Sequence, residues 1–163
     1  MRLDRRWIES NIPHQGLMCL LDEVIDWDAQ HVRCRSGTHR RPDHPLRSHG
    51  RLGAACGIEY AAQAMAVHGA LTGGALAPPS PAGNALAGEG GARPKAGFLA
   101  ALRGIRLHVL RLDDIDGDLI CDASLVAGDG GTALYDFALT SESQPLLSGR
   151  ATVVFDANQR LNL

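Results

Sequence analysis

Glu59 and Gln63 are polar side chains four residues apart in a segment that is otherwise mostly small and apolar. On a helix this spacing places the carboxylate and the carboxamide on one face, one turn apart. An ionised carboxylate is costly to move out of water unless it is paired, and burial raises its pKa toward the range of a general acid. Glu59 is therefore the first candidate for a catalytic group.

A structural role for Glu59 stays open beside the catalytic one. Buried carboxylates are often held by a basic partner, and Arg103 and Arg106 lie in a later segment with the pattern of a strand. A sheet packed on the helix would bring either guanidinium within reach of Glu59. The sequence thus permits an ion pair as well as a free catalytic carboxyl.

The segment that carries both side chains predicts one long helix over residues 53–72. It is rich in Ala, with Met, Ile and Leu and few β-branched residues, and Glu59 is its only Asp, Glu, Lys or Arg. A helix that is apolar on most sides is normally buried, and small side chains allow it to approach another surface closely. We therefore expect this helix to lie against a sheet.

Strand-like patterns of apolar residues flank this helix on both sides. The polar residues 37–51, rich in His, Arg and Pro, predict a loop before it, and turns rich in Gly and Asp separate the later strands. The expected strands cover residues 17–27, 31–36, 97–109, 119–127, 132–140 and 145–155. Two strands, one long helix and four antiparallel strands indicate an α+β fold, with the sheet curled around the central helix.

The length and composition fit one ordinary domain. The chain has 163 residues, of which 45% are hydrophobic and 21% charged, close to the globular average. One segment differs, because residues 73–94 are dense in Gly, Ala and Pro and predict a flexible insertion. We expect a single domain over residues 1–163 that carries this insertion.

Charge and cysteine content argue against several functional classes. A formal net charge of -2 gives no electrostatic reason to bind nucleic acid or an anionic membrane. The four cysteines have no metal-ligand spacing, so we expect buried thiols in a reducing compartment, no metal and no redox cofactor. The sequence shows neither a signal peptide nor an apolar stretch long enough to span a bilayer, which predicts a cytoplasmic location.

Three patches of the sequence resemble the hotdog-fold 3-hydroxyacyl-ACP dehydratases, and most of all the branch associated with aryl polyene pigment synthesis. Residues 12–22 (Ile-Pro-His-Gln-Gly-Leu-Met-Cys-Leu-Leu-Asp) are similar to the family's Pro-His-Arg-x-Pro-Met-Leu-Leu-Leu-Asp opening. Residues 50–64, with Gly-Arg-Leu and then Gly-Ile-Glu-Tyr-Ala-Ala-Gln-Ala, resemble the helix motif of that branch. Residues 96–99 (Ala-Gly-Phe-Leu) resemble its next strand. The resemblance covers most of the chain outside residues 73–94.

The resemblance implies dehydration of a 3-hydroxyacyl thioester to a trans-2-enoyl thioester, in aryl polyene, polyketide-like or fatty-acid-like synthesis. This reaction needs a base for the C2 proton and an acid for the C3 hydroxyl. The family pattern implies His44 as the base, with His49 as the alternative. It implies Glu59 as the acid, acting directly or through a water held with Gln63. Fatty-acid dehydratases place their histidine fourteen positions before the acid, where this chain has Pro45.

The same resemblance assigns the substrate site. Backbone N–H groups at the start of the helix, near Ala54 and Ala55, would face the thioester carbonyl. Phe98 on the following strand would contact the substrate. His14, in the opening segment, is expected to close a turn and to shape the edge of the pocket.

The family also implies partners. Its subunits pair edge to edge, with the tunnel between them and the histidine and the acid from opposite chains, so we expect a homodimer or a larger assembly. The acyl group would ride on the phosphopantetheine arm of an acyl carrier protein, with no cofactor held by this chain. An acidic carrier protein would meet basic residues. The expected contact residues are Arg40, Arg41, Arg47, Arg93 and Lys95.

Two other functions stay open. Hotdog acyl thioesterases also carry a single acid on the central helix, use it as a base or nucleophile, and do not need the loop histidine. A His44 remote from Glu59 would favour them. A non-catalytic hotdog subunit or carrier-binding module would be favoured by a Glu59 held in an ion pair with no tunnel reaching it.

Overall fold

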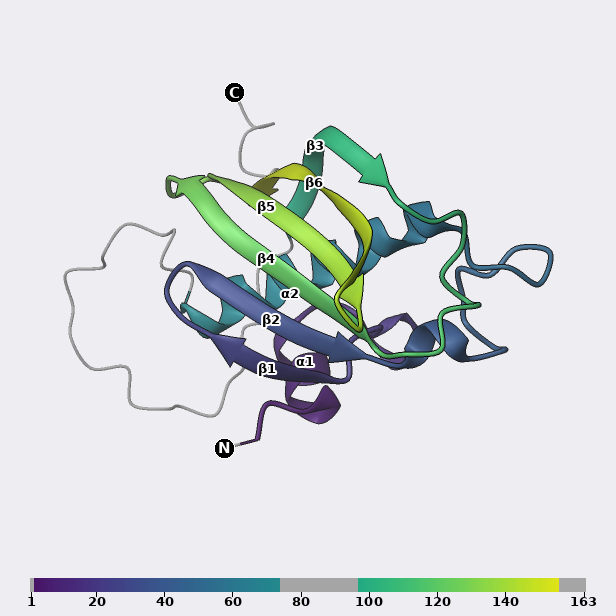
Figure 1. Cartoon of the computed structure of the whole chain (residues 1–163). Coiled ribbons are helices and arrows are strands. Elements are labelled where there is room, and N and C mark those ends of the chain that lie inside the picture. Colours follow the sequence, from purple (N-terminus) through teal and green to yellow (C-terminus); the bar gives the residue numbers. More distant parts are fainter. Residues whose placement is uncertain (1, 74–96, 156–163) are drawn as a thin grey trace, which may run out of the picture.

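The computed structural model describes residues 2–73 and 97–155, and Figure 1 shows the course of the chain. Its elements follow the order that the sequence predicts, with one helix added near the N-terminus. The insertion expected over residues 73–94 lies outside the described residues except for its first glycine. None of the helices in the described part is long and apolar enough to cross a membrane.

Six strands of the described residues form one antiparallel sheet. They are β1 (Glu23–Trp27), β2 (His31–Ser36), β3 (Gly97–Leu107), β4 (Leu119–Gly128), β5 (Thr132–Ser141) and β6 (Gln144–Phe155). Their order in the sheet is β1-β2-β4-β5-β6-β3, and every neighbouring pair is antiparallel. Short turns join β1 to β2, β4 to β5 and β5 to β6. Among the described strands, β3 lies at one edge of the sheet and pairs with β6 alone.

The long helix α2 (Gly57–Leu71) lies against one face of this sheet (Figure 1). Its buried side chains pack with inward-facing residues of β2 and β4, including Cys34 and Cys121. The first residue, Gly57, is so close to β6 that a Cβ there would lie 2.7 Å from Cδ2 of Leu147. The sheet therefore wraps around one central helix, which is the hotdog arrangement that the sequence predicts.

A short helix, α1 (Arg5–Asn11), has no counterpart in the sequence prediction. Asp4 caps it, since its Oδ1 accepts hydrogen bonds from the backbone N–H groups of Arg6 and Trp7. Ile8 is fully buried in the core. A helix of 7 residues is too short to show a clear hydrophobic period, so the pattern does not reveal it.

The strand expected over residues 17–27 begins only at Glu23. Its first part consists of the 3-10 turn η1 (Gly16–Met18) and an extended stretch in which residues 19–21 are fully buried. The apolar residues before Glu23 are therefore buried in the core without forming part of a strand.

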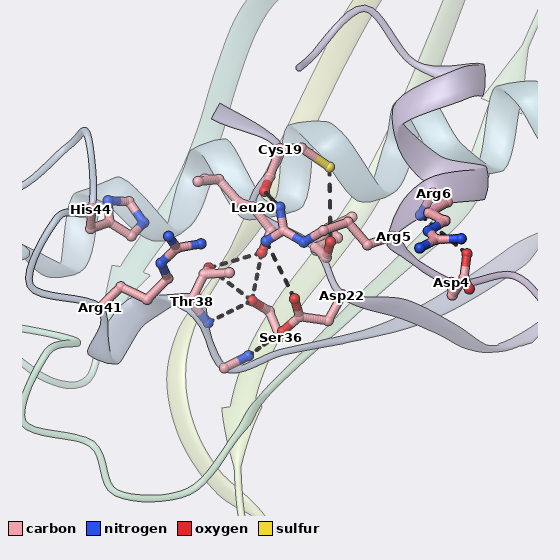
Figure 2. Close-up of polar contacts among 12 residues, drawn as sticks. Asp4, Arg5, Arg6, Cys19, Leu20, Asp22, Ser36, Thr38, Arg41 and His44 are labelled. Atoms are coloured by element: carbon pink, nitrogen blue, oxygen red, sulfur yellow. Dashed lines mark hydrogen bonds and ion pairs between the residues drawn. The ribbon is translucent and has the colours of Figure 1, made fainter. Parts of the chain in front are cut away.

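Side chains hold this extended stretch in place, as Figure 2 shows. The carbonyl of Leu20 accepts hydrogen bonds from the hydroxyls of Ser36 and Thr38, at the end of β2 and just beyond it. The carbonyl of Cys19 accepts one from Nη1 of Arg5 at 2.6 Å. The stretch is thus fixed between α1 and β2, and it forms a rigid support beside α2.

Candidate active site

Glu59 lies in the first turn of α2 with 31% of its side chain exposed. Its Oε1 accepts a hydrogen bond from Nε2 of Gln63 at 3.0 Å and another from Nε2 of His14, also at 3.0 Å. Its Oε2 has no hydrogen-bond partner among residues 2–73 and 97–155. One carboxylate oxygen is thus fixed by the chain, and the other is left without a hydrogen bond from the described residues.

Hydrogen bonding decides the protonation of Glu59. The hydrogen bond from His14 lowers the pKa of this carboxyl, burial raises it, and the hydrogen bond from Gln63 lowers it further. The net shift is downward, so the rise expected from the sequence is wrong. That expectation counted desolvation alone, whereas the fold also supplies two donors. Glu59 is therefore a carboxylate at neutral pH.

Gln63 is completely buried, and its amide is used in full by the chain. Its Oε1 accepts from the N–H of Leu20 at 2.8 Å, and its Nε2 donates to the carbonyl of Met18 at 2.8 Å and to Glu59. Both amide hydrogens are therefore committed. In this arrangement Gln63 orients the carboxylate and ties α2 to the stretch beside it, and it holds no hydrogen free for a substrate or a water.

His14 is the histidine that the fold brings to Glu59. It reaches the carboxylate from the loop between α1 and η1, and the sequence predicts only a turn residue there. The two residues are far apart in the chain, so spacing along the helix could not reveal the contact. A histidine flanked by Pro13 and Gly16 was the available signal, because such residues fix the backbone that presents a side chain.

His44, in the loop before α2, contacts this helix at Tyr60, the residue next to Glu59. Its Nδ1 accepts from the N–H of Leu46 at 3.1 Å, so its Nε2 carries the proton that is shared with the hydroxyl of Tyr60 at 2.9 Å. Burial lowers the pKa of His44, which keeps the imidazole neutral. Both nitrogens are thus occupied within the chain. Within one chain the partner of His44 is Tyr60, the next residue along the helix. The family pattern takes the histidine and the acid from opposite chains, so the role of His44 as the base stays a prediction.

His49, the alternative base, belongs to the segment of residues 41–53 that leads into α2. It is exposed, has a φ of 53°, and its Nδ1 is 3.0 Å from Oγ of Ser48. No contact joins it to Glu59 within the part of the chain that the structure describes. His49 therefore does not complete the site inside one chain.

Of the expected substrate contacts, the one at Ala54 is contradicted, and those at Ala55 and Phe98 stay predictions. The N–H of Ala54 donates to the carbonyl of Leu110 at 3.1 Å, so it is not available to a thioester and this expectation is wrong. The N–H of Ala55, in the 3-10 turn η3 (Ala54–Cys56) that leads into α2, has no acceptor among the described residues. Phe98 is 50% exposed on the edge strand β3.

The arginines that the sequence offers as partners of Glu59 do not reach it. Arg103 and Arg106 are exposed on β3, and neither has a carboxylate partner among the described residues. Arg103 lies opposite Arg150 of β6 in the sheet register. The structural ion pair considered for Glu59 is therefore not formed with either of them.

Most residues expected to contact a carrier protein are paired with carboxylates of the chain itself. Arg40 contacts Asp118 at 2.6 Å, Arg41 contacts Asp43 at 3.1 Å, and a guanidinium nitrogen of Arg47 lies 3.8 Å from Asp113. Arg93 and Lys95 lie outside the described residues. Within residues 2–73 and 97–155, no group of three or more His, Cys, Asp or Glu side chains is arranged to hold a metal ion.

Comparison with protein families gives a match over residues 6–162 to the model described as ApeP-like, ApeP dehydratase. A comparison with curated proteins gives no match. Among solved structures, the dehydratase heterocomplex ApeI:P from Xenorhabdus doucetiae is similar, with a TM-score of 0.75 and 21% identity. That alignment covers 96% of this chain and 97% of the other.

More distant structures share the fold alone. The PaaI protein from the phenylacetic acid degradation operon of E. coli has a TM-score of 0.54 and 13% identity, with 80% of each chain covered. A hypothetical thioesterase with coenzyme A from Streptococcus pneumoniae has a TM-score of 0.51 and 13% identity, with 82% of this chain and 84% of the other covered. Dehydratases and thioesterases thus share this architecture, and the side chains must decide between them.

Proposed function

The chain belongs to the ApeP-like family of dehydratases, and from that premise we propose that it removes water from a 3-hydroxyacyl thioester to form a trans-2-enoyl thioester. The observation that carries the proposal is the carboxylate of Glu59, with Oε1 fixed by two donors and Oε2 free of partners in the described chain. A fixed, half-buried carboxylate with one open oxygen is suited to move a proton on a bound substrate.

Because Glu59 is ionised, it starts the reaction as a base and not as the acid that the sequence predicts. Its Oε2 takes the C2 proton, the electrons of the C2–H bond form the C2=C3 double bond, and the C3–O bond breaks. The proton then passes from Oε2 to the leaving hydroxyl, which departs as water. The free N–H of Ala55 faces the thioester oxygen, where negative charge develops.

The substrate is an acyl group on the phosphopantetheine arm of a carrier protein, in a synthesis of the aryl polyene or fatty-acid type. Membership of the ApeP-like dehydratases and the likeness to the ApeI:P heterocomplex support this class of pathway. Arg103 and Arg106, which are exposed and have no carboxylate partner in the described chain, fit an acidic carrier better than the paired arginines of the loop.

A second hotdog chain covers the edge of β3 in the assembly that we propose. This edge strand exposes Phe98, Leu99, Leu102 and Leu107, with 39% to 51% of each residue accessible. An apolar edge with unpaired backbone groups favours pairing with another strand. A homodimer is the simplest such assembly. The relative named as a dehydratase heterocomplex supports a second candidate, an assembly with a different chain.

One observation favours a thioesterase as the second candidate. An ionised carboxylate on the central helix, whose one histidine partner in the described chain is His14 on Oε1, also suits attack on the thioester carbonyl or activation of water. The two functions differ in their products, because a thioesterase releases free thiol and leaves the hydroxyacyl group intact.

The proposal is tested with 3-hydroxyacyl groups, alkyl and aryl, loaded on a carrier protein. Enoyl product and free thiol are followed separately for the wild type and for Glu59→Gln, which keeps the shape of the side chain. Enoyl formation that depends on Glu59 supports the dehydratase. Free thiol that depends on Glu59 would assign the protein to the thioesterases, and no product of either kind would leave a non-catalytic subunit.

A further inference from the structure

Among the buried and partly buried histidines, His44 and His68 use both ring nitrogens, whereas His14 and His39 use one. His44 bonds both, to Leu46 and Tyr60, and His68 bonds both, to the hydroxyl of Tyr135 at 2.8 Å and the carbonyl of Asp28 at 3.1 Å. These two imidazoles join parts of the fold.

In His14 only Nε2 has a partner, which is Oε1 of Glu59, while Nδ1 is buried and has none among the described residues. His39 also leaves Nδ1 without a partner, but its Nε2 bonds the backbone carbonyl of Ile115, so the identity of the partner on Nε2 is what sets His14 apart. The imidazole of His14 therefore has a single contact, and that contact is with the proposed reacting group.

The loop that presents His14 is held at both ends. Ile12, two residues before it, is 2% exposed, and the chain after it is clamped by Gln63 through Met18 and Leu20. Between these anchors Gly16 has a φ of 59°, a conformation that favours glycine, although nothing would block a Cβ there. The imidazole thus approaches Glu59 from a fixed backbone.

We infer that His14 is a positioning residue for Glu59, and that each chain supplies this pair to its own site; the inference rests on the proposed dehydratase function. The donors of His14 and Gln63 occupy Oε1 from two directions, so the carboxylate cannot rotate without losing both. Proton transfer is thereby directed to Oε2. Glu59 touches the substrate, and His14 acts through Glu59 alone.

The first test uses His14→Ala and His14→Gln in the full chain. Gln places an N–H donor where Nε2 of His14 lies, so His14→Gln is expected to keep kcat within about threefold of the wild type, since it restores the hydrogen bond. His14→Ala is expected to lower kcat by about 10- to 100-fold, the effect of losing one hydrogen bond to a charged group. His108→Ala, an exposed histidine whose side chain has no partner in the described chain, is the matched control.

A second readout does not depend on turnover. The carboxyl pKa of Glu59, followed by carbon NMR titration, is expected to rise in His14→Ala and to return toward the wild-type value in His14→Gln. In addition, His14→Ala is expected to have no further effect in a Glu59→Gln background, because a residue that acts only through Glu59 adds nothing once the carboxylate is gone.

Mixing two variants tests whether the pair belongs to one chain. Differently tagged Glu59→Gln and His14→Ala chains are co-expressed, and the mixed assembly is purified through both tags. If His14 and Glu59 of one site belong to one chain, the mixed assembly should be no more active than the assembly made of His14→Ala chains alone. Recovery to about half of the wild-type activity, as one restored site in a dimer would give, would overturn the inference by placing His14 and Glu59 of one site in different chains.

The outcomes separate this inference from the proposed function. A wild type without enoyl formation overturns the proposed function. A wild type that forms enoyl product, with kcat and the pKa of Glu59 both unchanged in a folded His14→Ala, overturns only the role of His14. Loss of activity in His14→Gln equal to that in His14→Ala, at unchanged thermal stability, would also overturn positioning by a hydrogen bond.

Discussion

Glu59 and Tyr60 are neighbours on α2, and each meets a histidine, but the two contacts have different characters. Glu59 is partly exposed, and one of its oxygens has no partner in the described chain. Tyr60 is completely buried, and its hydroxyl lies between His44 and Oγ1 of Thr38 at 2.9 and 2.8 Å. The contact at Glu59 leaves Oε2 without a partner among the described residues, so this atom can take part in chemistry. The hydroxyl of Tyr60 is used by hydrogen bonds within the chain.

The difference shows what distinguishes a reactive group from a structural one in this fold. Both pairs bring an ionisable side chain and an imidazole within hydrogen-bond distance on the same helix. Only the pair at Glu59 combines a charged group, access from outside and an unused hydrogen-bonding position. A histidine near the central helix is therefore not in itself a sign of function.

The largest expected effect comes from Glu59→Gln. Removal of a general base is expected to lower kcat for enoyl formation by about 10²- to 10⁴-fold. Thermal stability should change little, because the amide can still accept from His14. Steady-state kinetics and a melting curve on the same sample check both parts. Activity of Glu59→Gln near the wild-type level would show that Glu59 is not the general base, and that Glu59 and Tyr60 do not differ in function.

Tyr60→Phe is expected to lower stability and to leave enoyl formation nearly unchanged. The change leaves Nε2 of His44 buried without an acceptor, at a cost of about 1–3 kcal/mol in the free energy of unfolding. Enoyl formation by the folded variant should stay within about threefold of the wild type, since the hydroxyl contacts no reacting atom in the mechanism. Urea unfolding and kinetics measure the two quantities. A loss of kcat comparable to that of Glu59→Gln would show that the hydroxyl of Tyr60 takes part in catalysis.

The buried histidines also predict how stability depends on pH. Burial lowers the pKa of His39, His44 and His68 below the value of about 6.5 that they have in the unfolded chain. Below pH 6.5 the unfolded chain therefore binds protons that the folded chain does not. Stability should fall as the pH drops, by up to about 1.4 kcal/mol per pH unit for each histidine, until the folded pKa is reached.

Urea unfolding at pH 7.5 and pH 5.5 measures this loss. Carboxylates with lowered pKa values titrate in more acidic solution, so this interval isolates the histidines. Equal unfolding free energies at the two values would show that the three imidazoles are not buried in the neutral form.

The smallest effect is expected on the outer face of the sheet. Asp136 of β5 contacts Arg150 of β6 at 2.7 Å, and both side chains are about half exposed. Asp136→Ala should change the free energy of unfolding by about 0.2–1 kcal/mol, as for other exposed ion pairs, and leave enoyl formation unchanged. A loss larger than that of Tyr60→Phe would mean that this face is covered in the assembly.

The fold could be predicted largely from the sequence, because the apolar helix and the later strands carry clear patterns and turn residues. The element at residues 5–11 was too short to show a pattern, and the apolar run before Glu23 indicated burial without revealing its backbone. Both misses concern segments held by tertiary contacts. The helix at residues 5–11 is held by the burial of Ile8 and by the hydrogen bond from Arg5 to the carbonyl of Cys19, and the extended stretch by hydrogen bonds to the Leu20 peptide.

The candidate site could be predicted only in part. Glu59 and Gln63 follow from helical spacing, and the structure joins them by a hydrogen bond. The partner histidine could not be found by counting back from Glu59, because the Gln63 amide brings a distant loop to the helix through Met18 and Leu20. The direction of the pKa shift was missed for the same reason, since it depends on a donor that only the fold supplies.

The most direct test of the central claim is hydration of a 2-enoyl thioester in D₂O, the reverse of the proposed reaction, by the wild type and by Glu59→Gln. A Glu59 carboxyl that moves the C2 proton predicts a 3-hydroxyacyl product with one deuterium retained at C2 after transfer to H₂O. Glu59→Gln should form this product far more slowly. Equal deuterium incorporation by the two proteins, or free thiol as the only product of the wild type, would contradict the account.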